Sequence, residues 1–238
     1  MRILGSFGLW IAGIGFFLFS FAFLALSLMI FSRDTSFGLA RRLFSVQLRI
    51  MGIRLKTKGR ENITPGKTYL IMGNHQSLFD IFVIPSAIPL VFTGVEASYH
   101  FSMPVWGYLI RKWGCIPINR SNLAEAKKSL EKARQTLGTG LSLAILPEGH
   151  RTRTGKMGPF KKGPFYLAKA AQADILPFGI RGGYDFQRRG GFLLSPGKVQ
   201  VWIGEAISYE SVAHLTVDEL KDRFFERILF LCYLRFMN

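Results

Sequence analysis

The stretch from residue 3 to residue 32 limits the fold of this sequence more than any other feature. It contains no charged residue, and Phe, Leu, Ile and Ala dominate it. A helix of roughly 20 apolar residues crosses the hydrocarbon core of a bilayer, so this stretch is long enough to cross with tilt or to bend within one leaflet. The apolar part of a cleavable signal peptide usually has roughly 7–15 residues and ends at a small-residue site. Arg2 is the only charge before the stretch, and no A-x-A site follows it, so we predict a retained membrane anchor.

The net charge of +16 is concentrated in the middle of the chain, where residues 33–173 contain 22 Lys or Arg and seven Asp or Glu. By the positive-inside rule, this excess predicts that the bulk of the protein lies on the cytoplasmic side of the inner membrane. A basic surface gains about 1 kcal/mol per Lys or Arg close to anionic lipid. Nucleic acid is the other common partner of a basic protein. The apolar stretch favours membrane lipid, so we expect no nucleic-acid partner.

Few side chains suit a metal site or a disulfide framework. Cys115 and Cys232 are the only cysteines, and the four histidines (75, 100, 150 and 214) show no H-E-x-x-H or comparable spacing. We therefore predict no metal.

Residues 36–53 carry apolar side chains at helical spacing, interrupted by Arg41, Arg42 and Arg49. This pattern is typical of a basic amphipathic helix lying in the membrane interface. The alternative is a helix whose apolar face packs on the core of the folded domain. We expect residues 1–53 to form the anchor with its interfacial helix and residues 54–238 to form one folded domain.

Short apolar segments at intervals along this domain predict a sheet. Residues 54–58 alternate like an edge strand, and helical segments lie between several of the strands that follow. The predicted buried strands are residues 69–72, 90–93, 115–118, 141–146, 175–180 and 199–203. Strands that alternate with helices predict an α/β fold in which helices cover both faces of a single mixed sheet.

Two helices have clear starting signals. Asn122 and Glu125 cap one that Gly138 ends, and Thr216 and Glu219 cap the last one. The apolar end of that last helix, residues 228–237, is either deeply packed or in contact with lipid.

His75 directly follows a predicted buried strand, and a carboxylate, Asp80, stands five residues further on. Five residues along an ideal helix turn by about 500°, so the two side chains share no helix face. They meet only if His75 lies in the loop after the strand and Asp80 in the first turn of the next helix. Asp80 then holds the imidazole in one tautomer and stabilises its protonated form. Because the sequence has no G-x-S-x-G nucleophile elbow, the histidine has to activate a hydroxyl of a substrate.

Ser77 and Asp80 also fit a capping box, with Ser77 at the N-cap of a helix and Asp80 at its third position. Helix starts of this kind are far commoner than active sites. This segment alone favours neither interpretation.

A basic loop follows the strand predicted at residues 141–146. Ligands of open α/β sheets bind at the carboxyl ends of the strands, so this loop and the His75 loop are expected to face one crevice. Arg151 and Arg120 are forked donors that suit a phosphate. The alternative is a solvated loop without a ligand. The basic residues of the loop, with no acid between them, are Arg151, Arg153, Lys156, Lys161 and Lys162.

Several sequence blocks together resemble the glycerolipid acyltransferase family, of the 1-acylglycerol-3-phosphate acyltransferase type. The family's N-H-x-x-x-x-D block matches Asn74, His75 and Asp80, and its F-P-E-G-T-R block resembles residues 146–151. The similarity runs from about residue 54 to 205, and the other similar blocks are residues 114–120, 158–163 and 176–180.

The resemblance implies that His75 is the catalytic base and Asp80 its orienting partner. A backbone amide near the Asn74 loop is expected to support the oxyanion. The substrate site that the resemblance implies, together with its basic neighbours, comprises Asn74, Arg120, Glu148, Gly149, His150, Arg151, Lys161 and Lys162.

The sequence departs from the family pattern at His150, where Thr is usual, and at Pro117 and Asn119. These departures leave the chemistry in place and the identity of the acceptor open. His150 either donates a hydrogen bond to a phosphate or simply packs.

The family resemblance implies transfer of an acyl group from an acyl thioester to the sn-2 hydroxyl of 1-acyl-sn-glycerol 3-phosphate (lysophosphatidic acid). The product would be phosphatidic acid for phospholipid synthesis. The co-substrate is acyl-CoA or acyl-carrier protein, and no cofactor is implied. One alternative is another lysolipid acceptor, such as lyso-ornithine lipid or a lysophospholipid. A more distant alternative is a non-catalytic, membrane-tethered binder of anionic lipid or nucleic acid.

Overall fold

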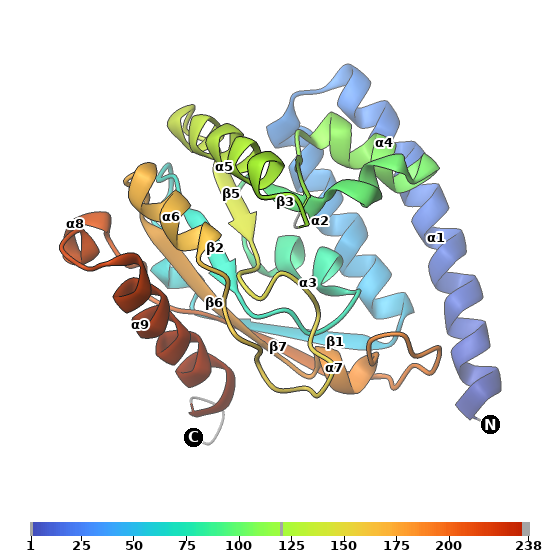
Figure 1. Cartoon of the computed structure of the whole chain (residues 1–238). Coiled ribbons are helices and arrows are strands. Elements are labelled where there is room, and N and C mark those ends of the chain that lie inside the picture. Colours follow the sequence, from blue (N-terminus) through green and yellow to red (C-terminus); the bar gives the residue numbers. More distant parts are fainter. Residues whose placement is uncertain (1, 120, 235–238) are drawn as a thin grey trace.

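A mixed sheet of seven strands forms the centre of the chain in the computed structural model, which describes residues 2–119 and 121–234. The strand order is β1-β7-β6-β2-β5-β3-β4 (Figure 1). β6 and β7 are antiparallel, and every other neighbouring pair is parallel, which confirms the predicted mixed α/β sheet. The strands are β1 (Ile53–Lys58), β2 (Leu70–Gly73), β3 (Phe92–Ala97), β4 (Ile116–Ile118), β5 (Ser142–Ile145), β6 (Ile175–Arg181) and β7 (Gly197–Ile203).

The predicted strands are all present, with shifted ends. β1 pairs only with β7 and is the edge strand that its alternating pattern indicated. The largest shift is in β3, which was predicted at residues 90–93 and runs from Phe92 to Ala97. The prediction followed the apolar run and stopped before the charged Glu96, which lies inside the strand.

Helices cover both faces of the sheet, as predicted. One apolar cluster joins the sheet to α1 (Arg2–Ile30), α2 (Arg33–Ile50), α3 (Asp80–Ala87) and α4 (Pro104–Trp113). A second cluster joins the opposite face to α5 (Leu123–Gly138), α6 (Gly163–Ala170) and α9 (Val217–Leu229). The remaining short elements are α7 (Gly183–Phe186), α8 (Tyr209–Val212), 3₁₀ turns at Arg60–Asn62 and Ser98–Ser102, and a π-helical turn at Phe230–Leu234.

The predicted helix caps of α5 and α9 are confirmed. The side chain of Asn122 accepts hydrogen bonds from the amides of Ala124 and Glu125, and Thr216 and Glu219 form a reciprocal capping box. Beyond α9, Leu231 and Cys232 are buried while Phe230 is exposed, so the described part of the apolar end is packed on one side. Residues 235–237 of that prediction lie outside the described residues.

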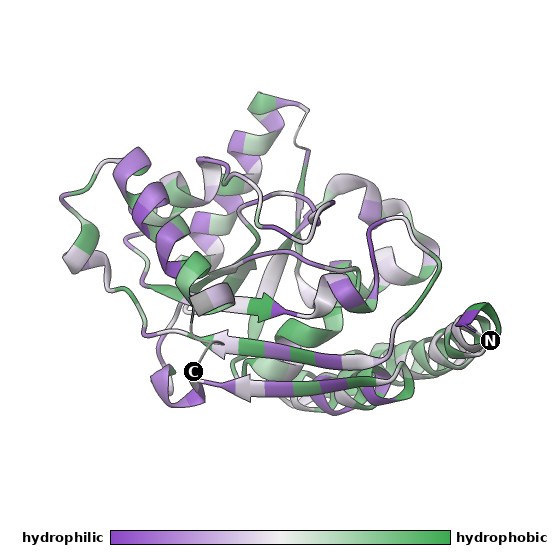
Figure 2. Ribbon diagram, turned by 90° about the horizontal axis from the view of Figure 1, so that it is seen from below, coloured by the Kyte–Doolittle hydropathy of each residue, from purple (hydrophilic) through white to green (hydrophobic). Residues whose placement is uncertain are grey.

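α1 is the one helix of the described chain that is long and apolar enough to cross a membrane. One side of it packs on the protein: the Gln47 side chain donates a hydrogen bond to the Gly13 carbonyl, and the hydroxyls of Ser27 and Ser36 lie 2.9 Å apart. Gly13 permits this approach, because a Cβ there would meet the sulfur of Met51. The opposite side exposes a row of large apolar side chains from Ile3 to Ile30. Figure 2 shows the mostly hydrophobic α1 along the edge of the molecule.

The apolar face of α2 is buried in the protein. Phe37, Ala40, Phe44 and Leu48 belong to the apolar core cluster, and the ring of Phe44 lies 5.2 Å from that of Phe82 in α3. The apolar face therefore packs on the protein, as the core-facing alternative expected, and the position of α2 relative to a membrane stays a prediction. The apolar pattern does not reveal this, because a helix face that meets lipid and one that meets a protein core use the same side chains.

Candidate active site

His75 and Asp80 meet at the carboxyl end of β2. His75 lies in the loop after the strand and Asp80 is the first residue of α3, the arrangement that their spacing requires. His75 Nδ1 lies 2.7 Å from Asp80 Oδ2, and the Asp80 carboxylate is almost fully buried. The same oxygen accepts hydrogen bonds from the amides of Gln76 and Ser77. Three groups of one short loop, the His75 ring and the amides of Gln76 and Ser77, are thus held by a single carboxylate oxygen.

The capping interpretation of Ser77 is partly correct. α3 begins at Asp80 and its N-cap is Phe79, so Ser77 is not the N-cap residue. The Asp80 side chain nevertheless reaches back to the Ser77 amide, as the carboxylate of a capping box does. One carboxylate therefore holds both the loop and the imidazole, and the two interpretations do not exclude each other.

The backbone of His75 is held from the other side by the loop after β5. Glu148 Oε1 accepts a hydrogen bond from the His75 amide at 2.7 Å, and the Thr152 amide donates one to the His75 carbonyl at 2.9 Å. Glu148 Oε2 accepts from the Gly158 amide at 2.8 Å, further along the basic loop. Burial raises the pKa of Glu148, although the two amide hydrogen bonds oppose that shift. Glu148 thus joins the His75 loop to the basic loop.

Three predicted substrate contacts are absent from the cavity beside His75. Both carboxylate oxygens of Glu148 accept hydrogen bonds from backbone amides. The side-chain amide of Asn74 exchanges two hydrogen bonds with the backbone of Ile180 and does not line the cavity. The ammonium of Lys162 pairs with Asp218 of α9 at 2.8 Å. A motif match identifies a residue but not the direction of its side chain: those of Glu148 and Asn74 hold backbone groups, and that of Lys162 forms a surface ion pair. Arg120 lies outside the described residues.

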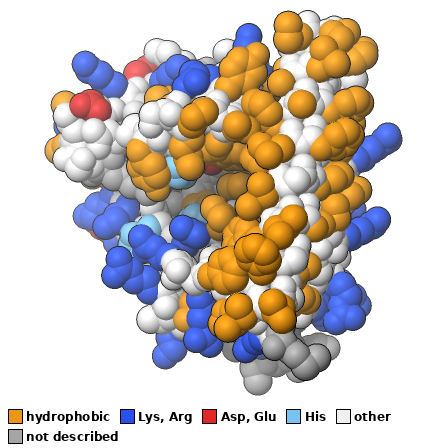
Figure 3. Space-filling model, turned by 90° about the vertical axis from the view of Figure 1, so that its right-hand side faces the viewer, with side chains coloured by type: hydrophobic (Ala, Val, Ile, Leu, Met, Phe, Trp, Pro, Cys, Tyr) orange, Lys and Arg blue, Asp and Glu red, His pale blue; other side chains and the backbone are white. Residues whose placement is uncertain are grey.

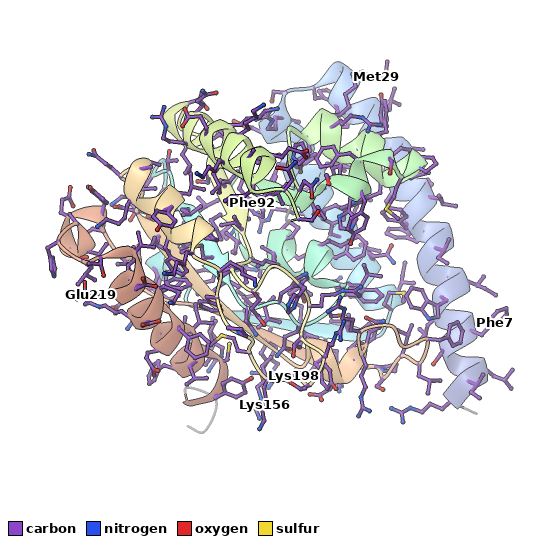
Figure 4. The ribbon with its side chains drawn as sticks, in the orientation of Figure 1. Phe7, Met29, Phe92, Lys156, Lys198 and Glu219 are labelled. Atoms are coloured by element: carbon purple, nitrogen blue, oxygen red, sulfur yellow. The ribbon has the colours of Figure 1, made fainter. Side chains whose placement is uncertain are left out.

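A cavity of about 750 Å³ opens where the two loops meet. Arg189, which the sequence analysis missed, joins the cationic rim, and its guanidinium donates a hydrogen bond to the Arg151 carbonyl. Figure 3 shows the hollow between Lys and Arg side chains and an apolar face, and in Figure 4 Lys156 of the basic loop points outward. The predicted site residues that line the cavity are His75, Asp80, Gly149, His150, Arg151 and Lys161.

The rest of the cavity wall is mainly apolar. It is built by side chains of α2, α3, α4 and α5, among them Phe37, Ile84, Leu109 and Leu130. Cys115 also lines it, but burial raises the pKa of this thiol to about 11. At neutral pH the thiol is protonated and therefore a poor nucleophile. Within the described residues, no three His, Cys, Asp or Glu side chains group as metal ligands would.

Three amides of the His75 loop are already used. Those of His75, Gln76 and Ser77 donate to Glu148 and Asp80, so the expected oxyanion donor at the Asn74 loop is not available from them. Among the described residues, the amides of His150 and Arg151 donate to no acceptor, and both residues line the cavity.

Two further framework residues escaped the sequence analysis. Gln76 is buried, and its side-chain oxygen accepts a hydrogen bond from the Gly183 amide at 2.9 Å. Thr152 is buried as well, and its amide holds the His75 carbonyl. A polar residue beside a motif was the only available signal, and it does not distinguish support from solvent exposure.

Known proteins resemble this chain in sequence and in fold. The sequence model described as acyltransferase matches residues 54–181. The chain is 33% identical over 174 residues to a 1-acyl-sn-glycerol-3-phosphate acyltransferase of Limnanthes douglasii, covering 73% of this chain and 60% of that protein. It is 31% identical over 175 residues to the protein of the same name from Pseudomonas aeruginosa, covering 73% and 67%. The chain spans between 49% and 61% of the length of three curated relatives.

The fold has a solved counterpart. The crystal structure of the 1-acyl-sn-glycerophosphate (LPA) acyltransferase PlsC from Thermotoga maritima superposes with a TM-score of 0.82, at 21% identity and over 96% of each chain. This likeness extends to the N-terminal helices as well as to the sheet, because it covers nearly the whole chain.

Proposed function

The chain belongs to the acyltransferase family, and on that premise we propose that it acylates the sn-2 hydroxyl of 1-acyl-sn-glycerol 3-phosphate from an acyl thioester, giving phosphatidic acid. One observation carries the proposal. The His75–Asp80 pair, at 2.7 Å, faces a cavity that has a cationic rim on one side and apolar walls on the other. A lysolipid with a phosphate head matches both sides.

His75 acts as the general base through Nε2, because Nδ1 faces Asp80. As the acceptor hydroxyl oxygen attacks the thioester carbonyl carbon, a C–O bond forms and Nε2 takes the hydroxyl proton. The tetrahedral intermediate then collapses, the C–S bond breaks, and the proton passes from Nε2 to the departing thiolate. The products are an ester and a free thiol. Such a base contributes roughly 10²–10⁴-fold to the rate, and positioning supplies further acceleration.

Asp80 stabilises the imidazolium that forms during the attack. Its buried carboxylate fixes the tautomer with Nδ1 protonated, which leaves the Nε2 lone pair free for the hydroxyl. The free amides of His150 and Arg151 are the best donors for the oxyanion of the tetrahedral intermediate.

The cationic rim holds the phosphate of the acceptor. The cations that line the cavity include Arg151 and Lys161 of the basic loop, and Arg189. A guanidinium binds a phosphate with two parallel hydrogen bonds. Arg120 is expected to assist them. The apolar part of the cavity takes an acyl chain, which those walls remove from water.

The exposed apolar side of α1 inserts into the membrane, while its other side stays on the catalytic domain. A lysolipid then reaches the cavity without leaving lipid for water, a transfer that costs about 0.8 kcal/mol per CH₂. The excess of Lys and Arg supports a position of the domain on the cytoplasmic side of the inner membrane.

The test is acyl transfer by the purified protein in mixed micelles. Labelled acyl-CoA and acyl-carrier protein are each supplied with lysophosphatidic acid, lyso-ornithine lipid or a neutral lysophospholipid. We expect labelled phosphatidic acid from at least one donor. Transfer only to a different lysolipid would mean that lysophosphatidic acid is not the acceptor. Binding of anionic lipid without any transfer would mean that the protein is a non-catalytic lipid binder.

A further inference from the structure

The cavity contains a second histidine–carboxylate pair. Glu96 lies near the end of β3, and His100 follows in the 3₁₀ turn at Ser98–Ser102. His100 Nδ1 lies 2.7 Å from Glu96 Oε2, and both residues line the cavity beside His75. Their side chains remain 29% and 22% exposed, so the pair is accessible to a ligand in the cavity.

One polar atom of each partner remains unused. Within the described residues, His100 Nε2 and Glu96 Oε1 make no hydrogen bond. Nearby walls of the cavity are apolar and include Trp106, Leu109 and Ile110 of α4. Leaving such polar atoms unpaired once a ligand displaces water is costly. An apolar chain that fills this space incurs that cost, and a chain with a matching polar group avoids it.

A hydroxyl is the group that matches best. With His100 neutral and its Nδ1–H donating to the Glu96 carboxylate, both Nε2 and Oε1 are acceptors, and a hydroxyl donates to either. With His100 protonated, Nε2–H donates to the hydroxyl oxygen instead. A ketone or an ester oxygen accepts only, so it suits only the protonated form.

The place of the pair in the sheet indicates which part of a substrate it meets. β3 is separated from β2 by β5, and neighbouring strands lie about 4.8 Å apart, so the pair stands on the order of 10 Å from the loop of His75. That distance is too long for contact with the reacting carbonyl. It corresponds to a position further along an acyl chain whose thioester or ester end lies at His75.

We propose that Glu96 and His100 form a recognition site for a hydroxyl group carried on the acyl chain in the cavity. The proposal rests on the acyl transfer proposed above and specifies its substrate class. The hydroxylated chain belongs to the thioester donor or to the lysolipid acceptor, and the experiment separates these sources.

The experiment compares matched substrates with and without a mid-chain hydroxyl. One arm varies the acyl chain of the CoA donor, and the other varies the chain of lysophosphatidic acid. In the wild type we expect kcat/KM to be about tenfold higher for the hydroxylated chain in one arm, the effect of one charge-assisted hydrogen bond. In Glu96→Leu/His100→Phe this preference disappears while transfer of the plain chain persists.

A matched control is available elsewhere on the surface. Glu210 and His214 have the same spacing but lie outside the cavity, so Glu210→Leu/His214→Phe should retain the full preference. If the double variant at Glu96 and His100 does not fold, His100→Phe alone removes the free Nε2 and should reduce the preference. The ratio of the two substrates serves as the readout, because a merely structural role of the pair would change both rates alike.

Equal rates for hydroxylated and plain chains in both arms, or a preference that survives in the variants, would overturn the proposal. Absence of transfer with every substrate is a failure of the proposed function instead. In that case, the pair is tested by binding alone. The wild type should bind a hydroxylated fatty acid more tightly than the plain one, and the variants should bind both equally.

Discussion

Two histidine–carboxylate pairs line the same cavity at the same separation of 2.7 Å, and they differ in their surroundings. Asp80 is 1% exposed and accepts two backbone amides beside the imidazole of His75. Glu96 is 22% exposed and, within the described residues, accepts from no backbone amide. The backbone of His75 is also held on both its amide and its carbonyl by the loop after β5.

This difference shows that the pair itself does not define a catalytic site. A base must be held in register with a reacting atom, because small displacements cost large factors in rate. The hydrogen bonds around His75 supply that rigidity, and the cationic rim next to it positions the acceptor. The pair at Glu96 has neither, so it suits binding better than proton transfer.

The two pairs should differ most in the loss of kcat that follows removal of each imidazole. His75→Ala should lower kcat by roughly 10²–10⁴-fold, the usual contribution of a general base. His100→Ala should change kcat with an unsubstituted donor by less than about threefold, because the ring does not reach the reacting atoms. Initial rates with labelled thioester measure both, and vesicle flotation checks that each variant still binds membranes. Similar losses in the two variants would contradict the comparison.

Neutralising each carboxylate is the next test. Asp80→Asn keeps the size of the side chain but removes the charge that stabilises the imidazolium, so kcat should fall by at least about a hundredfold. Glu96→Gln is the matched change and should leave kcat for a plain donor nearly unchanged. A rate for Asp80→Asn within a few-fold of the wild type would show that the buried charge has no catalytic part.

The cationic rim beside the first pair predicts an effect on acceptor binding. Arg151→Ala should raise KM for lysophosphatidic acid by about tenfold or more, since hydrogen bonds to charged groups contribute about 1.5–3 kcal/mol. Lys162→Ala lies in the same loop, but its ammonium forms a surface ion pair with Asp218. Such a pair contributes about 0–1 kcal/mol to stability, so this variant should fold, and because Lys162 does not line the cavity its KM should change little. Equal shifts would show that loop charge, rather than the cavity rim, binds the acceptor.

The smallest expected effect concerns the support behind His75. Burial raises the pKa of Glu148 in the folded protein above its ordinary value. Its contribution to stability is therefore fully present below the unfolded pKa and is lost as pH rises through the folded pKa. The free energy of unfolding of the wild type should fall across that acid range relative to Glu148→Gln. Urea unfolding of both proteins at a series of pH values measures it, and parallel pH profiles would contradict the buried position of the carboxylate.

The sequence was sufficient to bring His75 and Asp80 together. A strand end, a spacing of five residues and a helix start leave few other arrangements, and the structure has that one. The same logic of strand ends brought Arg151 and Lys161 to the cavity. The mixed sheet and both helix caps were also predictable, because local apolar patterns and capping residues determine them.

Side-chain direction was beyond the sequence. Glu148 and Asn74 belong to the matched motifs, yet both hold backbone groups, since their orientation depends on contacts with distant residues such as Gly158 and Ile180. Glu96 was hidden for another reason: the strand that carries it extends past the apolar run that predicted it. The sequence left two surroundings open for the apolar face of α2, because its periodicity does not distinguish lipid from α3.

The most direct test of the account removes the His75 ring and returns it from solution. Turnover of lysophosphatidic acid is measured for His75→Gly with and without imidazole in the medium. We predict almost no turnover without imidazole and a rise that follows its concentration, because the free base enters the space that the ring leaves above Asp80. Wild-type turnover by His75→Gly in the absence of imidazole would contradict the role of His75 as the base.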